Sequence, residues 1–153
     1  MQTIDEVLEE IPFFGGLKHE DLELIAGCGS NVHFEDGETL FREGGPADTF
    51  LLIRHGSVSL SCYAPPKGSV ILDTVGPGDI LGWSWLFPPH RWHFDAKAVG
   101  VVRATQFDAV CLRTKIEQDP RFGYELMRRF TQVLLQRLQW TRMRLIDMYA
   151  DHT

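Results

Sequence analysis

The sequence predicts a mainly β domain with helices before and after the sheet, and three regional patterns support this fold class. Residues 1–29 carry apolar side chains at helical spacing. Residues 30–107 consist of short apolar or alternating runs separated by turn residues, and residues 108–153 return to a helical pattern. A chain of 153 residues has the size of one ordinary domain. We therefore expect a single domain over residues 1–153, with the sheet between two groups of helices.

The N-terminal part predicts two short helices. The first is indicated by apolar residues three and four apart, and the second by an apolar cluster that follows the turn at residues 12–16. Two glycines end the second pattern, as expected at a helix C-terminus. The residues concerned are Ile4, Val7 and Leu8 for the first helix, and Leu22, Leu24, Ile25 and Ala26 for the second, with Gly27 and Gly29 after it.

The central part predicts an antiparallel sandwich or barrel. Its apolar runs are short, and Gly-rich or Pro-rich turn signals separate them with no helical pattern in between. We expect strands at Thr39–Phe41, Phe50–Ile53, Val58–Cys62, Val70–Leu72, Ala96–Val102 and Ala104–Phe107.

The C-terminal part predicts two helices. Asp108 is a suitable N-cap for a helix over Ala109–Gln118, and Pro120 begins a long final helix that extends to Tyr149. One stripe of this helix (Leu126, Phe130 and Val133) would face the sheet. A second, heptad-like stripe predicts pairing with a second copy of the chain, and the alternative is one broad face on a monomer. The second stripe consists of Met127, Thr131, Leu134, Leu138, Thr141, Leu145 and Met148.

Composition and charge narrow the class of protein. The net charge of −6 argues against binding nucleic acid or anionic membrane through bulk charge. The N-terminus is acidic where a signal peptide would be basic, and no apolar run approaches the roughly 18 residues of a membrane span. Cys28, Cys62 and Cys111 are odd in number and lack CxxC spacing, so we expect free thiols rather than disulfides or a metal site. We expect a soluble, cytoplasmic protein that does not contact membranes.

Five short stretches of the chain carry a family resemblance. They are Ile11–Leu17 (IPFFGGL), Asp36–Gly44 (DGETLFREG), Ala47–Ile53 (ADTFLLI), Gly56–Val58 (GSV) and Gly76–Gly82 (GPGDILG). In their order and spacing they resemble the effector domain of the cyclic-nucleotide-binding Crp/Fnr regulator family. The resemblance implies an eight-stranded jelly-roll-like β-roll, a ligand loop at residues 76–95, and a long C-terminal helix that joins two subunits into a homodimer. It also implies a regulatory, signal-transducing domain without catalytic or metal-binding residues.

In this family the loop that follows the last stretch is the phosphate-binding cassette. A cyclic phosphate is best held by backbone N–H groups at a short helix N-terminus and by one guanidinium, and Gly82 permits close approach of the backbone. Two family positions differ here: Trp83 replaces the expected glutamate, and Arg91 precedes by one residue the arginine position, which Trp92 occupies. The ligand candidates are therefore cAMP, cGMP or another small anionic, planar molecule, and cAMP specificity does not transfer.

These considerations define the candidate ligand-binding residues. Gly82, Ser84 and Arg91 would hold the anion, and Trp83 and Trp85 would shape the pocket. The stretch Arg137-Leu-Gln-Trp-Thr141 resembles one that supplies a base contact in cAMP-dependent activators, although Thr141 is equally well explained as a polar residue that sets the register of helix pairing. The complete predicted set is Leu81, Gly82, Trp83, Ser84, Trp85, Arg91, Trp92 and Thr141.

Two other functions remain open at this stage. Trp83 and Trp85 could fill a vacated pocket and leave a degenerate dimeric scaffold. His90 and His93 could belong to a cupin-like metal enzyme, but the HxH pair of such sites is absent, and no catalytic triad, carboxylate pair or P-loop is visible. Crp/Fnr regulators continue into a DNA-binding helix-turn-helix. If Thr153 ends the protein, we expect output through a protein partner and not through direct nucleic-acid contact.

Overall fold

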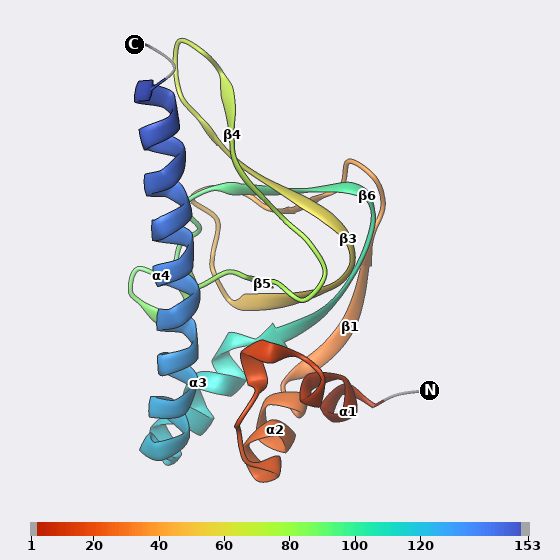
Figure 1. Cartoon of the computed structure of the whole chain (residues 1–153). Helices are drawn as coiled ribbons and strands as arrows, with labels where there is room; N and C mark the ends of the chain where they lie inside the picture. The colour runs from red at the N-terminus through yellow and green to blue at the C-terminus, as the bar shows by residue number, and fades with distance from the viewer. Residues whose placement is uncertain (1–2, 151–153) are drawn as a thin grey trace.

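Residues 3–150 of the computed structural model are described, and they form a curled antiparallel sheet with short helices at its base and one long helix along its side (Figure 1). The predicted mainly β fold with flanking helices is confirmed. The helical elements are α1 (Ile4–Glu9), a 3₁₀ turn η1 (Pro12–Phe14), α2 (His19–Ala26), a 3₁₀ turn η2 (Ser84–Leu86), α3 (Ala109–Gln118) and α4 (Pro120–Ala150).

The two predicted N-terminal helices correspond to α1 and α2. Thr3 caps α1 in a capping box: its hydroxyl accepts from the Glu6 backbone N–H at 3.4 Å, and the Glu6 carboxylate accepts from the Thr3 N–H at 3.2 Å. Both helices bury apolar side chains such as Leu8 and Ile25 toward the base of the sheet. Residues 1 and 2 of the predicted N-terminal region lie outside the described part.

The sheet has the order β1-β6-β3-β4, with β2 paired to β6 and β5 paired to β3. Residues 3–150 form six strands instead of the eight that the resemblance implies, because β3 and β6 each pass through two of the predicted runs without interruption. The predicted runs did not include β1 or β5. The strands are β1 (Gly29–Phe34), β2 (Thr39–Phe41), β3 (Thr49–Tyr63), β4 (Ser69–Val75), β5 (Ile80–Leu81) and β6 (Asp95–Asp108).

A glycine permits the bend of β3 against β6. Gly56 has φ +87°, and a Cβ at this position would overlap the carbonyl oxygen of Val101. The pairing register between the two strands shifts on either side of His55, between Ile53 and Ser57. The sheet therefore curls at a point where only glycine fits.

Alternate residues of β3 face two separate cores. Phe50 and Leu52 pack into a helical core beneath the sheet, whereas Leu51 and Ile53 pack into the interior of the roll. This period-two alternation is the pattern expected of a strand with both faces covered. The helical core also contains Phe14, Trp85, Phe107, Phe122, Leu126 and Phe130, and the roll core also contains Phe41, Val58, Leu60, Leu81, Trp92, Phe94 and Val102.

The C-terminal helices begin where the sequence predicted. The Asp108 carboxylate accepts from the backbone N–H groups of Val110 at 2.8 Å and Cys111 at 3.2 Å, and Pro120 is the first residue of α4. Leu126 and Phe130 of the predicted sheet-facing stripe of α4 are fully buried, whereas Val133 is half-buried. Within residues 3–150, none of the helices combines the length and the apolar character that crossing a membrane requires.

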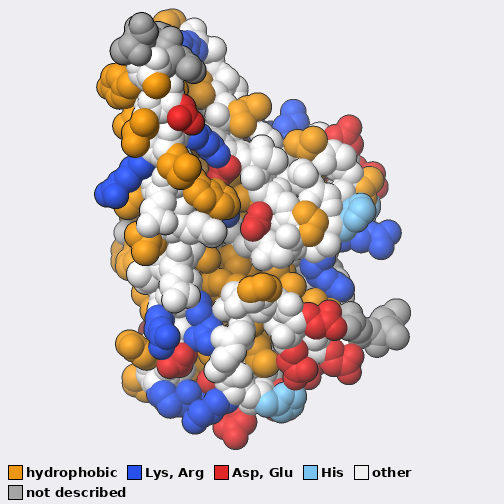
Figure 2. Space-filling model, in the orientation of Figure 1, with side chains coloured by type: hydrophobic (Ala, Val, Ile, Leu, Met, Phe, Trp, Pro, Cys, Tyr) orange, Lys and Arg blue, Asp and Glu red, His pale blue; other side chains and the backbone are white. Residues whose placement is uncertain are grey.

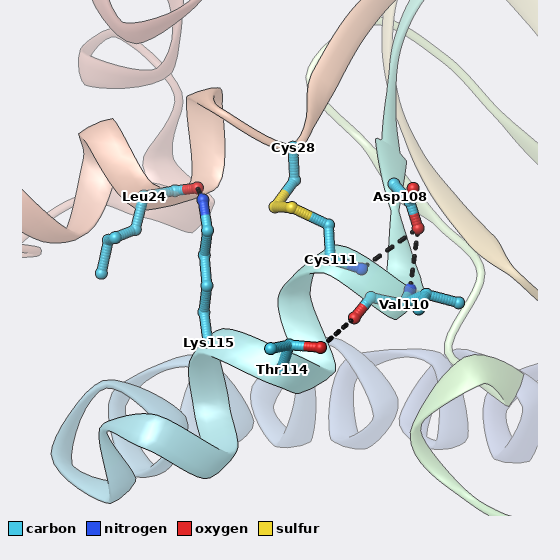
Figure 3. The surroundings of a disulfide bond; sticks show 7 residues. All are labelled: Leu24, Cys28, Asp108, Val110, Cys111, Thr114 and Lys115. Atoms are coloured by element: carbon cyan, nitrogen blue, oxygen red, sulfur yellow. Dashed lines mark hydrogen bonds between the residues drawn. A yellow bond between two sulfur atoms is a disulfide. The ribbon is translucent and has the colours of Figure 1, made fainter.

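The prediction of three free thiols is wrong, because Cys28 and Cys111 form a disulfide (Figure 3). Cys28 precedes β1 and Cys111 lies in the first turn of α3, with their Cα atoms 5.8 Å apart. The pairing of β1 with β6 brings them together, and the backbone N–H of Asp108 donates to the Cys28 carbonyl at 2.9 Å. Because the two cysteines are 83 positions apart in the sequence, spacing along the chain gave no sign of this pairing. Cys62 is free.

Candidate functional site

The predicted ligand loop connects β5 to β6 and folds back on the segment before β3. Its second half is extended: the Trp92 carbonyl accepts from the Gly44 N–H at 2.8 Å, the Trp92 N–H donates to the Gly45 carbonyl at 3.0 Å, and the His90 carbonyl accepts from the Ala47 N–H at 2.8 Å. Successive side chains of an extended segment point to opposite sides. Trp92 accordingly faces the interior of the roll, and Arg91 is exposed.

Trp92 occupies the roll interior next to Gly82. Its ring stacks on Phe41, with the ring centroids 3.7 Å apart and the ring planes at 12°. Gly82 has φ +103°, and a Cβ there would lie 2.8 Å from the Trp92 ring carbon Cη2. Glycine is thus required here by its backbone conformation and by the ring above it. In this structure, the group that approaches the Gly82 backbone is the Trp92 indole.

Trp85 belongs to the other core. It is fully buried, stacked on Phe50 with a centroid distance of 5.4 Å, and edge-to-face with Phe130 at 5.4 Å. Its indole Nε1 is buried with no hydrogen-bond partner in the described part of the chain. Of the two tryptophans expected to shape or fill the pocket, Trp85 therefore packs outside the roll interior.

Trp83 lies between the two cores and contacts α4. Its ring packs against Phe94, with the centroids 5.7 Å apart, and the Arg137 Cζ atom lies 5.4 Å from the Trp83 ring centroid. A guanidinium over an indole face at this distance is a favourable cation–π arrangement. The residue in the expected glutamate position therefore links the ligand loop to the long helix.

Arg137 is the largely buried cation of this contact, with 13% of its side chain exposed. Its guanidinium donates to the Asp73 carboxylate on β4 at 3.2 Å and to the Ile80 carbonyl on β5 at 3.0 Å, while its Nε has no partner among residues 3–150. Burial lowers the pKa of the Arg137 guanidinium, and the nearby carboxylates of Asp73 and Asp79 partly offset this effect. One side chain of α4 thus contacts β4, β5 and the ligand loop.

Asp73 joins a second cation to the same cluster. The Arg144 guanidinium donates to the Asp73 carboxylate at 2.6 Å and also to the Leu72 carbonyl. In Figure 1 the hairpin of β3 and β4 rises beside the C-terminal half of α4, where these contacts form. The C-terminal half of α4 is therefore attached to the sheet by two arginines that share one carboxylate.

The structure brings some predicted site residues together and separates others. Leu81, Gly82 and Trp92 lie in or beside the roll core with Trp83, and Ser84 is buried at the start of η2. Two further predicted residues lie at the surface: Arg91 donates to the Gly44 carbonyl at 3.4 Å, and the exposed Thr141 on α4 donates to the Arg137 carbonyl at 2.9 Å.

Sequence reasoning missed Arg137 and Asp73. A usable signal existed for Arg137, because it continues the sheet-facing stripe of Leu126, Phe130 and Val133 at spacings of four, three and four. A charged residue in a buried stripe needs a partner, and this requirement pointed to a carboxylate on the sheet. No local pattern identified Asp73, since its role depends on the placement of β4 beside α4.

Two further features surround the loop. An open groove of about 730 Å³ lies between α4 and the turn before β5, with Phe13, Pro77, Gln136 and Trp140 among its lining residues.

The predicted pairing stripe of α4 is uncovered in the single chain, and Figure 2 shows hydrophobic side chains along the upper part of this helix. Leu138, Leu145 and Met148 are 49%, 51% and 61% exposed. Within residues 3–150, no cluster of three metal-ligating side chains occurs.

Fold and loop together define a β-roll domain with an attached C-terminal helix. The family model described as the cyclic nucleotide-binding domain matches residues 31–119, and the chain belongs to this family. It is 30% identical over 145 residues to a CRP-like cAMP-activated global transcriptional regulator of Mycobacterium tuberculosis. The aligned residues make up 95% of this chain and 63% of the regulator. It is also 30% identical over 122 residues to the nitrogen fixation regulation protein FixK of Bradyrhizobium diazoefficiens, and this alignment covers 80% of this chain and 48% of FixK. The chain thus spans about half to two thirds of these relatives.

Solved structures agree on the architecture. A cyclic nucleotide-binding protein of Geobacter metallireducens superposes with a TM-score of 0.80 at 28% identity, covering 90% of this chain and 99% of that one. The N-terminal domain of a Streptomyces coelicolor transcriptional regulator superposes with a TM-score of 0.70 at 27% identity, covering 85% of this chain and 91% of that one. The cAMP-bound regulatory domain of Toxoplasma gondii PKA gives 0.72 over 87% of this chain and 49% of that one, and at 16% identity it shows the fold alone.

Proposed function

We propose that this cyclic nucleotide-binding-type domain is a non-catalytic sensor that binds cAMP, cGMP or another small anionic, planar ligand inside the roll. The observation that carries the proposal is the contact of Arg137 with Trp83. Because Arg137 belongs to α4, a ligand that moves the loop acts on α4 through this contact. The same side chain also binds β4 and β5, so the loop, the sheet and α4 meet at one residue. The regulatory relatives support a signalling role.

In this proposal the ligand competes with Trp92. A phosphate held against the Gly82 backbone needs the space that the indole now occupies. Arg91 is the adjacent residue in an extended segment, so a shift of one residue would turn Arg91 inward and Trp92 outward. The anion would then be held by Arg91, Gly82 and Ser84, with Leu81 and Trp83 beside it, while Trp85 supports the loop from the helical core.

The signal would leave through α4. The exposed stripe that includes Leu138 and Leu145 would pair two copies of the chain, and Thr141 lies in the same stripe. A ligand that binds two pairing arrangements with different affinity shifts their populations. A protein partner that distinguishes the two arrangements would then receive the signal.

A specific observation favours one alternative, a dimeric scaffold without a ligand. Trp92 is 4% exposed and stacked on Phe41, which is the packing expected of a permanent core residue. In that case Trp92, and not Trp85, would be the residue that closes the pocket.

Calorimetric titration of the purified protein with cAMP and with cGMP separates the two functions, with tryptophan emission as a second readout. We expect saturable binding that changes the emission, because Trp83 and Trp92 border the site. The variant Trp92→Arg supplies an inward guanidinium without any shift, and we expect it to bind at least about tenfold more tightly. If neither protein binds millimolar cyclic nucleotide, the proposal is overturned in its cyclic-nucleotide form and the scaffold is favoured.

A second substitution tests the exchange of the two residues. Arg91→Ala should weaken binding about tenfold or more in the wild type, where Arg91 must hold the anion. The same change should have little effect in the Trp92→Arg background, because the inward guanidinium is already present. Equal losses in the two backgrounds would contradict the exchange.

A further inference from the structure

A row of basic side chains crosses the outer face of the sheet, on the side opposite the roll core. Arg103 on β6 is the register partner of His33 on β1 and of His55 on β3. Directly paired residues in antiparallel strands project from the same face, with Cβ atoms about 5 Å apart. The neighbouring residues Val102 and Ala104 are buried in the roll core, so Arg103 points outward. Three basic side chains therefore lie next to one another on three adjacent strands.

A β-bulge adds a fourth. Ile53 pairs with Ala104 and His55 pairs with Arg103, which leaves Arg54 as an additional residue on β3. A bulge places two consecutive side chains toward one face, whereas a regular strand would place one of them inside. Arg54 and His55 are both exposed, and both line an open depression of about 620 Å³ with Asn31, His33 and Arg103. We call His33, Arg54, His55 and Arg103 the basic row.

The basic row is almost free of compensating charge. Among residues 3–150, Glu35 is its one carboxylate contact, 3.6 Å from the His33 Nε2, while Arg54, His55 and Arg103 have no ion-pair or side-chain hydrogen-bond partner. The guanidinium groups of Arg54 and Arg103 are both charged, and like charges held close together on a sheet are destabilising. In a chain of net charge −6, two unpaired guanidinium groups on one depression, those of Arg54 and Arg103, are a feature that packing does not require.

The groups that line the depression are mainly hydrogen-bond donors. The Asn31 Oδ1 accepts from the Thr105 hydroxyl at 3.2 Å, which leaves the Asn31 amide NH₂ group as a donor. Guanidinium groups bind phosphate oxygens in pairs of parallel hydrogen bonds, and the depression has the volume of a small-molecule site. We propose that the basic row binds a phosphoryl group, at a site separate from the roll interior.

Titration of the full chain with inorganic pyrophosphate tests this site. We expect saturable binding, and Arg103→Gln should raise the Kd about tenfold or more, because Arg103 lies at the centre of the row between His33 and His55. The matched control is Arg128→Gln, which removes the same charge from an exposed position on α4. The absence of binding at millimolar pyrophosphate, or an equal loss in the Arg128→Gln variant, would overturn the proposal.

Stability provides a second readout that a purely structural arginine would not give. In buffer without phosphate, Arg103→Gln should raise the melting temperature, because it relieves repulsion between the Arg54 and Arg103 guanidinium groups. Pyrophosphate should raise the melting temperature of the wild type and leave that of Arg103→Gln nearly unchanged. A lower melting temperature for Arg103→Gln in both buffers would mean that Arg103 supports the sheet, and it would contradict the proposal.

The source of the phosphoryl group is resolved by comparing two probes. Tighter binding of pyrophosphate than of a phosphoserine peptide indicates a small phosphorylated molecule, and the reverse order indicates a phosphorylated protein segment. Because Trp83, Trp85 and Trp92 do not line this depression, binding here should leave their emission unchanged. This difference separates the basic row from the cyclic-nucleotide titration, so either proposal can fail alone.

Discussion

The Arg137 guanidinium lies over the Trp83 indole, with Cζ 5.4 Å from the ring centroid. This contact joins the ligand loop to the long helix, and the same guanidinium is bound to Asp73. The residue at the family's glutamate position therefore has a partner on α4, and the interaction uses its ring face. A cation–π contact between partly buried groups contributes about 1–2 kcal/mol.

Substitution of Arg137 should affect both stability and coupling. We expect Arg137→Gln to lower the free energy of unfolding by about 1–3 kcal/mol, because the Ile80 carbonyl loses its donor and Asp73 retains Arg144 alone. Arg137→Lys should recover only part of this loss, since an ammonium cannot reproduce the planar fork. Urea denaturation measures the change. Full recovery by lysine would indicate that charge alone is required.

Trp92 should be a major contributor to the roll core. Trp92→Ala should lower the free energy of unfolding by about 3–5 kcal/mol, because it leaves a large cavity beside Phe41 and Gly82. Trp140→Ala is a suitable comparison, since that ring is 44% exposed and its removal should cost much less. Both values can be obtained by chemical denaturation. Similar losses for the two variants would mean that Trp92 does not fill the roll interior.

The disulfide should stabilise the fold by closing a long loop. Cys111→Ser, or a reducing agent, should lower the free energy of unfolding by about 2–4 kcal/mol, mainly because the unfolded chain regains freedom. Cys62→Ser controls for the loss of a thiol, because Cys62 is free. Thermal melts with and without reductant measure the difference. A melting temperature independent of reductant would show that the bond is not formed in solution.

The exposed stripe of α4 should control self-association. Leu138→Glu combined with Leu145→Glu should convert the proposed dimer to a monomer, because buried like charges would oppose one another across the helix pair. Met143→Glu introduces one carboxylate at an exposed position on a different side of the helix and should leave the dimer intact. Light scattering after gel filtration gives the mass of each variant. A wild-type monomer, or dissociation by Met143→Glu, would contradict this pairing.

Local signals were sufficient for much of the fold. The run at Thr39–Phe41 became β2, Asp108 became the N-cap of α3, and the apolar spacing of Leu126 and Phe130 gave the correct face of α4. Each of these features depends on residues a few positions apart, which is the range that periodicity and capping rules cover. The uninterrupted course of β3 was missed because His55-Gly56 resembles a turn, whereas in the sheet it forms a bend.

The candidate site was less predictable because its contacts join distant segments. The alternation that places Trp92 inward and Arg91 outward is set by hydrogen bonds to Gly44 and Gly45, which no local pattern encodes. Asp73 reaches Arg137 only because β4 folds beside α4. Trp83 and Trp85 are two residues apart, yet Trp85 is fully buried in the helical core, whereas Trp83 lies between that core and the roll core.

The bond between Cys28 and Cys111 also makes the roll a covalent ring, since β1 through β6 all lie between its two ends. A protease that cuts once within this ring, for example at the exposed hairpin tip near Lys67, would separate no fragment from the molecule. Such a nicked chain would migrate as one band until a reductant was added, and only then as two. Cleavage in the roll would therefore go unnoticed in any assay that omits reduction.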